Sequence, residues 1–278
     1  NPRFYAIASI REDVKVRYWF SDAFLGEYHA FHANVLLPQG NYAARVVESI
    51  NGKTLIYSFF YTSGLINSHR VFLPPKQLDT DERGRLLLKS FDHWEDVAYD
   101  ILDQNHFNTI RCLFDNPTAS HTIEDNRWVV GSRSGYELFV VEKPADDFIW
   151  EGVLSVEGMG KLGLVTDMDE DGSGYYYSFD VVNGHIEVRA WGFNEADIRS
   201  NFNFKVLQDN RFTINPLYTY HFKLIRFGNY IELAIDGLVK LTLIDYNYNN
   251  NFIGLYSASS VVSLNNSFIK KLPPLEDE

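Results

Sequence analysis

The stretch His185–Trp191 reads HIEVRAW and the stretch Tyr230–Ile235 reads YIELAI, and these two runs decide the fold. Polar and apolar side chains alternate in both, so one face of each extended strand is packed and the other is wet. Two antiparallel sheets stacked face to face require this pattern. Similar β-rich runs, separated by tight turns, continue from Trp128 almost to the end of the chain. We therefore predict a jelly-roll or concanavalin-like β-sandwich over residues 126–272.

The first 75 residues are predicted to form short antiparallel strands that are separate from the C-terminal sandwich. β-rich runs are separated by the charged turn at residues 11–13, by Pro38-Gln39-Gly40 and by Asn51-Gly52. An Asn-Gly pair between two such runs is a strong hairpin signal. The spacing is typical of propeller blades, a sandwich or a barrel.

Residues 76–125 change character and are predicted to connect the two parts. Apolar residues recur between positions 92 and 104 with the rhythm of one buried helix face, so we expect one helix there. Residues 115–125 are expected to form a loop between domains. The last residues, 273–278, are expected to form a solvated acidic tail.

Composition limits the classes of function. The chain has 278 residues with a net charge of -12, which argues against a nucleic-acid partner, because phosphate binding needs clustered Lys and Arg. No run approaches the roughly 18 apolar residues that a membrane helix needs. The single cysteine, Cys112, excludes an internal disulfide and leaves the cellular compartment open. A neutral ligand such as a sugar fits this balance, and no cofactor is expected.

Several segments, taken in order, resemble glycoside hydrolase family 32, the invertases, levanases and inulinases. The first part is similar to the last propeller blade and to the exit from the propeller, and the second part is similar to the C-terminal sandwich. Residues 18–28 are similar to a blade-edge pattern S-D-x-x-L-G-P, with Glu27 in place of proline. The other segments that carry the resemblance are residues 41–48, 52–60, 73–78, 83–87, 169–176 and 230–237.

The resemblance implies partial five-bladed-propeller blades, a linker and a sandwich, in an enzyme that hydrolyses β-fructofuranosides with retention. Such double displacement requires two carboxyl groups about 5–5.5 Å apart. The family motifs that carry these acids (Asn-Asp-Pro, Arg-Asp-Pro and Glu-Cys) do not occur in this sequence. We therefore expect the chain to be a truncated, processed or separate part of a longer protein, with no catalytic residue of its own.

Tyr42 and Phe59 match aromatic positions of the family's last blade and are the predicted substrate-binding residues. Sugars present apolar C–H faces that stack on aromatic rings. The alternative is that both rings are ordinary strand aromatics in the core of the blade.

The stretch Asp167-Met168-Asp169-Glu170-Asp171-Gly172 imitates the start of a calcium loop. Ser178 stands where an EF-hand needs a bidentate Glu, so a charged hairpin turn is favoured, and Asp167, Asp169 and Asp171 are weak metal candidates. Tyr175-Tyr176-Tyr177 alternates faces, so one or two of its rings should look outward. An outward ring on a sandwich could bind a glycan or seal a domain interface, and the alternative is an ordinary exposed ring without a function.

Three hypotheses about function follow. The first is the C-terminal portion of a family-32-like glycoside hydrolase acting on sucrose or fructan. The second is a carbohydrate-binding or interaction module without catalysis, and the third is a fragment of a family-43-like arabinanase or xylosidase. An open blade edge also predicts pairing with a second copy or with a missing N-terminal propeller segment.

Overall fold

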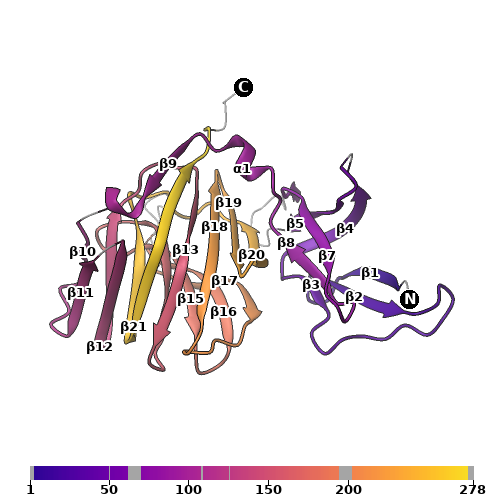
Figure 1. Ribbon diagram of the computed structural model, residues 1–278, viewed down its shortest axis with the longest axis horizontal. Coiled ribbons are helices and arrows are strands. Elements are labelled where there is room, and N and C mark those ends of the chain that lie inside the picture. Colours follow the sequence, from indigo (N-terminus) through magenta and orange to yellow (C-terminus); the bar gives the residue numbers. More distant parts are fainter. Residues whose placement is uncertain are drawn as a thin grey trace.

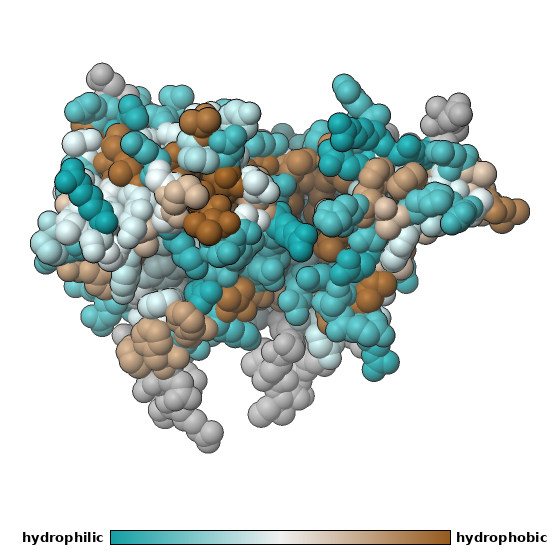
Figure 2. All heavy atoms as spheres, turned by 90° about the horizontal axis from the view of Figure 1, so that it is seen from below, coloured by the Kyte–Doolittle hydropathy of each residue, from teal (hydrophilic) through white to brown (hydrophobic). Residues whose placement is uncertain are grey.

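The computed structural model describes residues 3–49, 51–61, 70–107, 109–124, 126–193 and 202–274. The protein consists of a small N-terminal part at the right of Figure 1 and a larger β-sandwich at the left. Extended strands dominate both parts, which confirms the all-β prediction. On the face seen in Figure 2, hydrophilic side chains cover much of both parts and apolar side chains form separate patches.

The N-terminal part contains two small antiparallel sheets, as expected for blade-like segments. One has the order β1-β2-β3, and the other has the order β4-β5-β7-β8 with β6 paired to β5. The hairpin predicted at Asn51-Gly52 joins β4 to β5. The strand bounds are β1 (Phe4–Ile10), β2 (Lys15–Ser21), β3 (Val35–Leu37), β4 (Asn41–Glu48), β5 (Thr54–Tyr61), β6 (Arg70–Phe72), β7 (Lys76–Thr80) and β8 (Leu86–Lys89).

The connecting segment contains less helix and more strand than its pattern predicts. The helix predicted over Asp92–Gln104 is wrong beyond its first turn, because α1 covers only Trp94–Val97. It is followed by β9 (Asp100–Asp103), which pairs with the C-terminal strand, and by the 3₁₀ turn η1 (Gln104–His106). Part of the expected loop is also a strand, β11 (Ala119–Glu124). Tertiary pairing here overrides local periodicity. Residue 125 lies outside the described residues, and the domain limits remain a prediction.

The sandwich has two sheets, joined by two long strands that run through both. β12 (Arg127–Glu142) and β21 (Phe252–Lys271) pair along most of their length and bend together near Gly135 and Ser259, which both have positive φ. The other strands are β10 (Arg111–Cys112), β13 (Phe148–Glu157), β14 (Lys161–Met168), β15 (Gly174–Asp180), β16 (His185–Gly192), β17 (Asn203–Arg211), β18 (Thr219–Phe227), β19 (Tyr230–Ile235) and β20 (Leu238–Ile244).

The two sheets are defined by the strands that flank β21. Sheet I follows the order β17-β16-β15-β14 and continues through the first half of β21 to the second half of β12. Sheet II follows the order β20-β19-β18-β13 and continues through the second half of β21 to β12 and β9. The main hydrophobic core lies between the sheets, and the inward residues of the HIEVRAW run, Ile186, Val188 and Ala190, belong to it. The sandwich prediction is confirmed.

The N-terminal part packs on the sandwich through a second hydrophobic core and a buried ion pair. Val16, Leu37 and Ile56 from the small sheets pack with Ala234 and Val239 of the sandwich. Beside this core, Lys76 of β7 lies 3.4 Å from Glu232 of β19, and their side chains are 2% and 0% exposed. The contact between the N-terminal part and the sandwich is therefore shielded from water.

The short helix α1 is fixed to the outer face of sheet II by charges. Glu95 accepts hydrogen bonds from Lys223 of β18 and Lys270 of β21. Both lysines also pair with Glu151 of β13. Burial alone would raise the pKa of Glu95, but these hydrogen bonds outweigh it, and the pKa lies below its usual value.

Candidate carbohydrate-binding pocket

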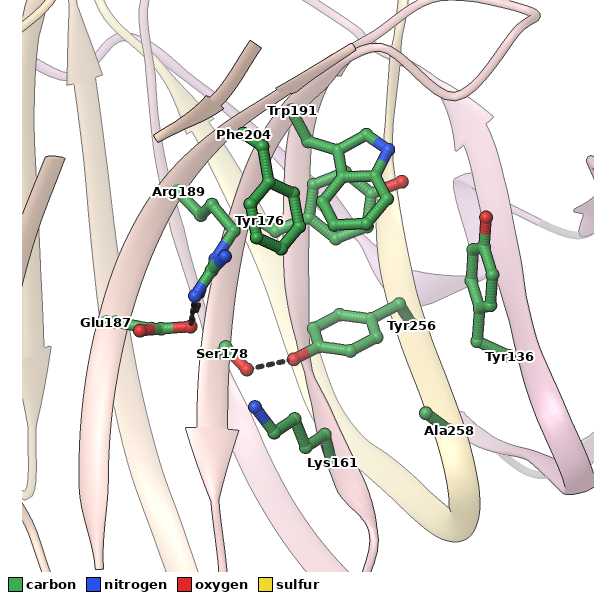
Figure 3. Close-up of a pocket in the computed structure, with 10 residues that line it drawn as sticks. All are labelled: Tyr136, Lys161, Tyr176, Ser178, Glu187, Arg189, Trp191, Phe204, Tyr256 and Ala258. Carbon is green, nitrogen blue, oxygen red and sulfur yellow. Dashed lines mark hydrogen bonds and ion pairs between the residues drawn. The ribbon is translucent and has the colours of Figure 1, made fainter. Parts of the chain in front are cut away.

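A pocket of about 250 Å³ opens on the outer face of sheet I. Six strands of this sheet contribute side chains to it, and Figure 3 shows aromatic rings gathered around a small group of polar side chains. The lining residues are Tyr136, Lys161, Tyr176, Ser178, Glu187, Arg189, Trp191, Phe204, Tyr256 and Ala258.

The floor of the pocket depends on the absence of a side chain at Gly163. This glycine faces Tyr256 on one neighbouring strand and Ser178 on the other. The Tyr256 ring therefore lies across β14 and its hydroxyl contacts the Ser178 hydroxyl. A Cβ atom at position 163 would lie 1.8 Å from the carbonyl oxygen of Tyr177 and 2.9 Å from Cε1 of Tyr256. Burial raises the pKa of the Tyr256 phenol, which keeps its proton as a hydrogen-bond donor.

A fork-shaped ion pair forms the charged wall. Arg189 and Glu187 lie two residues apart on β16 and therefore on the same face. Arg189 donates from Nη2 and Nε to Oε1 of Glu187, at 2.8 and 3.2 Å. The Arg189 guanidinium also lies 4.5 Å from the centre of the Phe204 ring. Arginine carries five N–H donors, and Glu187 uses two of them, so this plane is fixed and retains donors for a ligand.

Aromatic rings form the remaining wall. The centre of the Tyr176 ring lies 5.7 Å from that of Trp191 and 5.5 Å from that of Tyr256. Tyr136 stands at the opposite rim and is 43% exposed. Apolar ring faces beside charged donors and acceptors are suited to a sugar, which has apolar C–H faces and a rim of hydroxyls.

The outward-facing tyrosine expected in the run 175–177 is Tyr176, but it is not exposed. Tyr175 and Tyr177 point into the main core, whereas Tyr176 belongs to a cluster on the outer face. Tyr176 is only 7% exposed because Trp191 and Tyr256 pack against it. One ring of the run therefore faces outward, as predicted, and it is buried in a pocket wall.

The predicted substrate-binding residues lie in the N-terminal part, away from this pocket. Tyr42 on β4 and Phe59 on β5 are directly opposite in the register, and Phe59 is opposite Phe72 on β6. The Phe59 and Phe72 ring centres are 4.3 Å apart, and Phe72 is 60% exposed. The structure thus brings Tyr42 and Phe59 together in an aromatic row that crosses three strands.

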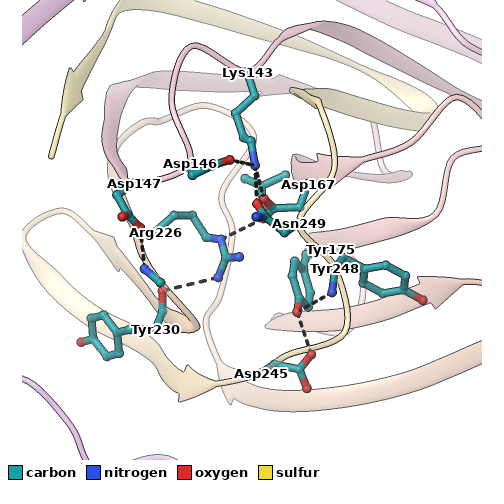
Figure 4. A network of polar contacts seen from close by, with 12 residues as sticks. Lys143, Asp146, Asp147, Asp167, Tyr175, Arg226, Tyr230, Asp245, Tyr248 and Asn249 are labelled. Carbon is teal, nitrogen blue, oxygen red and sulfur yellow. Dashed lines mark hydrogen bonds and ion pairs between the residues drawn. The ribbon is translucent and has the colours of Figure 1, made fainter. Parts of the chain in front are cut away.

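The weak metal candidates are not brought together. Asp167 is buried and pairs with Lys143 at 2.9 Å and with Arg226 at 2.8 Å (Figure 4). Asp169 instead accepts hydrogen bonds from the backbone N–H groups of Asp171 and Ser173, as a hairpin turn requires. Across the described ranges, no group of three or more His, Cys, Asp or Glu side chains is placed to hold a metal ion.

Further polar contacts extend the network around Asp167 (Figure 4). Arg226 also donates to the carbonyl oxygen of Tyr230 at 3.4 Å, and its guanidinium lies 5.1 Å from the centre of the Tyr175 ring. The Tyr175 hydroxyl donates to Asp245 at 2.7 Å. These buried charges compensate one another, so the network is structural.

Most pocket residues were missed because they are far apart in the sequence. Tyr256 is separated from Tyr176 by 80 positions, and the register of β14, β15 and β21 alone brings them together. One signal was present: Glu187, Arg189 and Trp191 occupy the polar face of HIEVRAW. An arginine and a tryptophan on the wet face of a strand indicate a binding surface.

No protein-family model matches the chain, and no curated protein matches it. Solved structures with a similar fold include an exo-inulinase from Aspergillus awamori (TM-score 0.63, 10% identity, 98% of this chain and 53% of that chain). They also include a fructosyltransferase from A. japonicus (TM-score 0.54, 9% identity, 99% and 57%). A third is a glycoside hydrolase family 32 β-fructofuranosidase from Bombyx mori (TM-score 0.52, 13% identity, 94% and 47%). The chain therefore has a family-32-like fold and spans about half the length of each of these proteins.

Among the described residues, no helix is long and apolar enough to cross a membrane.

Proposed function

We propose that this chain is the C-terminal portion of a family-32-like glycoside hydrolase acting on β-fructofuranosides such as sucrose or fructan. In this proposal its sandwich binds carbohydrate in the pocket of sheet I and does not cleave it. The similarity of fold to the exo-inulinase and the β-fructofuranosidase supports the choice of substrate class.

The pocket itself carries the proposal. It combines the buried Tyr176 and Tyr256 rings, the Trp191 ring and the oriented Arg189–Glu187 pair in a space of about 250 Å³. Aromatic faces stack on the C–H side of a sugar, and a fixed carboxylate–guanidinium pair accepts from and donates to neighbouring hydroxyls. Each cation of the lining has its own carboxylate: Arg189 pairs with Glu187 at 2.8 Å, and Lys161 pairs with Asp180 at 3.4 Å. These compensated charges favour a neutral ligand.

The same lining argues for binding without catalysis. Retaining hydrolysis needs two carboxyl groups about 5–5.5 Å apart. Glu187 is the one carboxylate among the residues that line this pocket, and Arg189 already engages it. We expect no hydrolysis by this chain alone, and release of reducing sugar from sucrose or inulin by the purified chain would contradict this.

Tyr42 and Phe59 remain proposed as sugar contacts of the N-terminal part. Their support is the aromatic row with Phe72, on a strand face opposite the one that carries the buried Ile56 and Phe60. A loss of affinity in a Tyr42→Ala/Phe59→Ala variant, with the sandwich pocket intact, would support a second contact region.

A partner strand is proposed at the edge of the N-terminal part. Among the described strands, β4 pairs only with β5, so its other edge has no strand partner, although the Ala44 N–H group donates to Oγ of Ser9 at 3.3 Å. A second copy of the chain or a further blade of the same protein would complete this sheet. Measurement of the mass in solution distinguishes a dimer, paired through this edge, from a monomer. We also propose that the domain boundaries lie at residues 75 and 125.

Isothermal titration with fructose, fructan, arabinan and xylan fragments tests the proposed function. Trp191→Ala should weaken binding, whereas Tyr218→Ala, which removes a 63% exposed ring outside the pocket, should not. Preference for fructan supports the family-32-like assignment, and preference for arabinan or xylan favours a family-43-like protein. Equal binding by both variants and the natural chain would remove the pocket from the proposal.

A further inference from the structure

A continuous line of aromatic rings leads from the pocket to the edge of sheet I. Beyond Tyr176, the Trp191 ring centre lies 4.8 Å from that of Phe204 and 5.6 Å from that of Phe202. Phe202 in turn lies 5.2 Å from Phe193. The outer members of this line, Phe193, Phe202 and Phe204, are named here the phenylalanine platform.

The platform is far more exposed than the pocket wall. Phe193, Phe202 and Phe204 are 51%, 49% and 61% exposed, whereas Tyr176 is only 7% exposed. A single sugar seated against Tyr176 and Tyr256 would not need apolar rings beyond the pocket mouth. Contiguous exposed apolar groups next to a binding pocket indicate that the ligand continues over them.

Phe204, the platform ring next to the pocket, is held in place before any ligand arrives. Phe204 lies opposite Trp191 in the pairing of β17 with β16, and the Arg189 guanidinium lies over its ring. Figure 3 shows Phe204, Arg189 and Trp191 side by side at the same end of the pocket. Rings fixed in this way stack on a ligand with little loss of conformational freedom.

We propose that the ligand is a chain of several sugar residues, one in the pocket and the next ones stacked on Trp191 and the phenylalanine platform. This inference rests on the proposed function, because it assigns the pocket to a sugar. Phenylalanine has no hydrogen-bonding group, so the platform contacts C–H faces and tolerates different linkages. The polar pocket then selects the sugar, and the platform adds affinity for a polymer.

The experiment is a titration series with fructose and fructo-oligosaccharides of increasing length. Affinity should rise with length until the platform is covered and then level off. Phe202→Ala and Phe193→Ala, which lie outside the pocket lining, should each weaken binding of the long oligosaccharides about three- to tenfold. Neither should change the affinity for fructose, whereas Phe204→Ala, at the mouth, should weaken both.

The outcomes separate the two levels of the proposal. If affinity does not change with the length of the oligosaccharide but Arg189→Ala still abolishes binding, the proposed role of the platform is wrong and the pocket remains the sugar site. Equal weakening of fructose and of long oligosaccharides by Phe202→Ala also overturns the platform. Absence of binding by every sugar overturns both the platform and the proposed function. Tyr218→Ala, which removes a 63% exposed ring outside the pocket and the platform, is the control and should change neither affinity.

Discussion

Replacing Lys76 with methionine tests how the N-terminal sheets are joined to the sandwich. The Lys76 ammonium group lies 3.4 Å from Glu232 and 5.0 Å from the centre of the Tyr230 ring. It also donates to the carbonyl oxygen of Pro74 at 2.7 Å. Burial lowers the pKa of Lys76, and the carboxylate of Glu232 opposes this shift.

The expected cost comes from the charge that would be left behind. Glu232 is 0% exposed, and after the substitution it would retain the hydrogen bond from the Tyr230 hydroxyl at 2.5 Å. Its Oε1 atom has no hydrogen-bond partner within the described structure. Breaking a buried ion pair in this way costs about 3–5 kcal/mol, which for a chain of this size lowers the melting temperature by roughly 6–20 °C.

Urea unfolding and a thermal melt measure the loss, and a second lysine provides the control. Lys89 pairs with Asp79 at 2.7 Å, with 40% and 45% of their side chains exposed, so Lys89→Met should cost only about 0–1 kcal/mol. Lys76→Met/Glu232→Leu should recover most of the stability, because replacement of a whole buried pair by apolar groups is often neutral. Equal costs for Lys76→Met and Lys89→Met, or no recovery in the double variant, would refute the reasoning.

Three further predictions concern the sandwich. Gly163→Ala should lower the free energy of unfolding by about 1–3 kcal/mol or more in a urea titration and weaken sugar binding, because its Cβ atom would meet the Tyr177 carbonyl oxygen at 1.8 Å and Cε1 of Tyr256 at 2.9 Å; unchanged affinity would contradict the described floor. Glu95→Gln should lower the free energy of unfolding at pH 7. This loss relative to the natural chain should shrink as the pH falls below about 4.5, the pKa of an unfolded glutamate, and then through the lower pKa of Glu95 in the folded protein. The reason is that a carboxyl group whose pKa is lower in the folded state stabilises the protein at pH values above its unfolded pKa. A difference in melting temperature between the two proteins that stays constant from pH 3 to 7 would contradict this prediction. Asp167→Asn should cost about 3–5 kcal/mol in the same urea assay, since it leaves the buried Arg226 without its anion; a cost below about 1 kcal/mol would show that the pair is unimportant.

The sandwich was predictable because alternation in a half-buried strand is a local property. In HIEVRAW the apolar positions Ile186, Val188 and Ala190 do enter the core, and the polar face does turn outward. β17 was missed because its pattern is inverted: Phe204 is exposed and Gln208 is buried. A strand whose outer face binds a ligand does not follow the rule that links burial to hydrophobicity.

The incorrect helix and the hidden pocket have a common cause. Residues 92–104 have a helical rhythm, yet Ile101 and Leu102 pair with β21, a strand more than 150 positions later. The pocket likewise depends on register between distant strands, which no local pattern encodes. Tyr42 and Phe59 were found through a family resemblance, and they do lie side by side.

Carbohydrate binding by the outer face of sheet I is tested most directly by titrating the natural chain and Arg189→Ala in parallel with a short fructan. The natural chain should give saturable binding, and the variant should bind at least about tenfold more weakly, because it loses charge-assisted hydrogen bonds to the sugar. Equally tight binding by the variant, or no binding by the natural chain, would contradict the assignment of this pocket to a sugar.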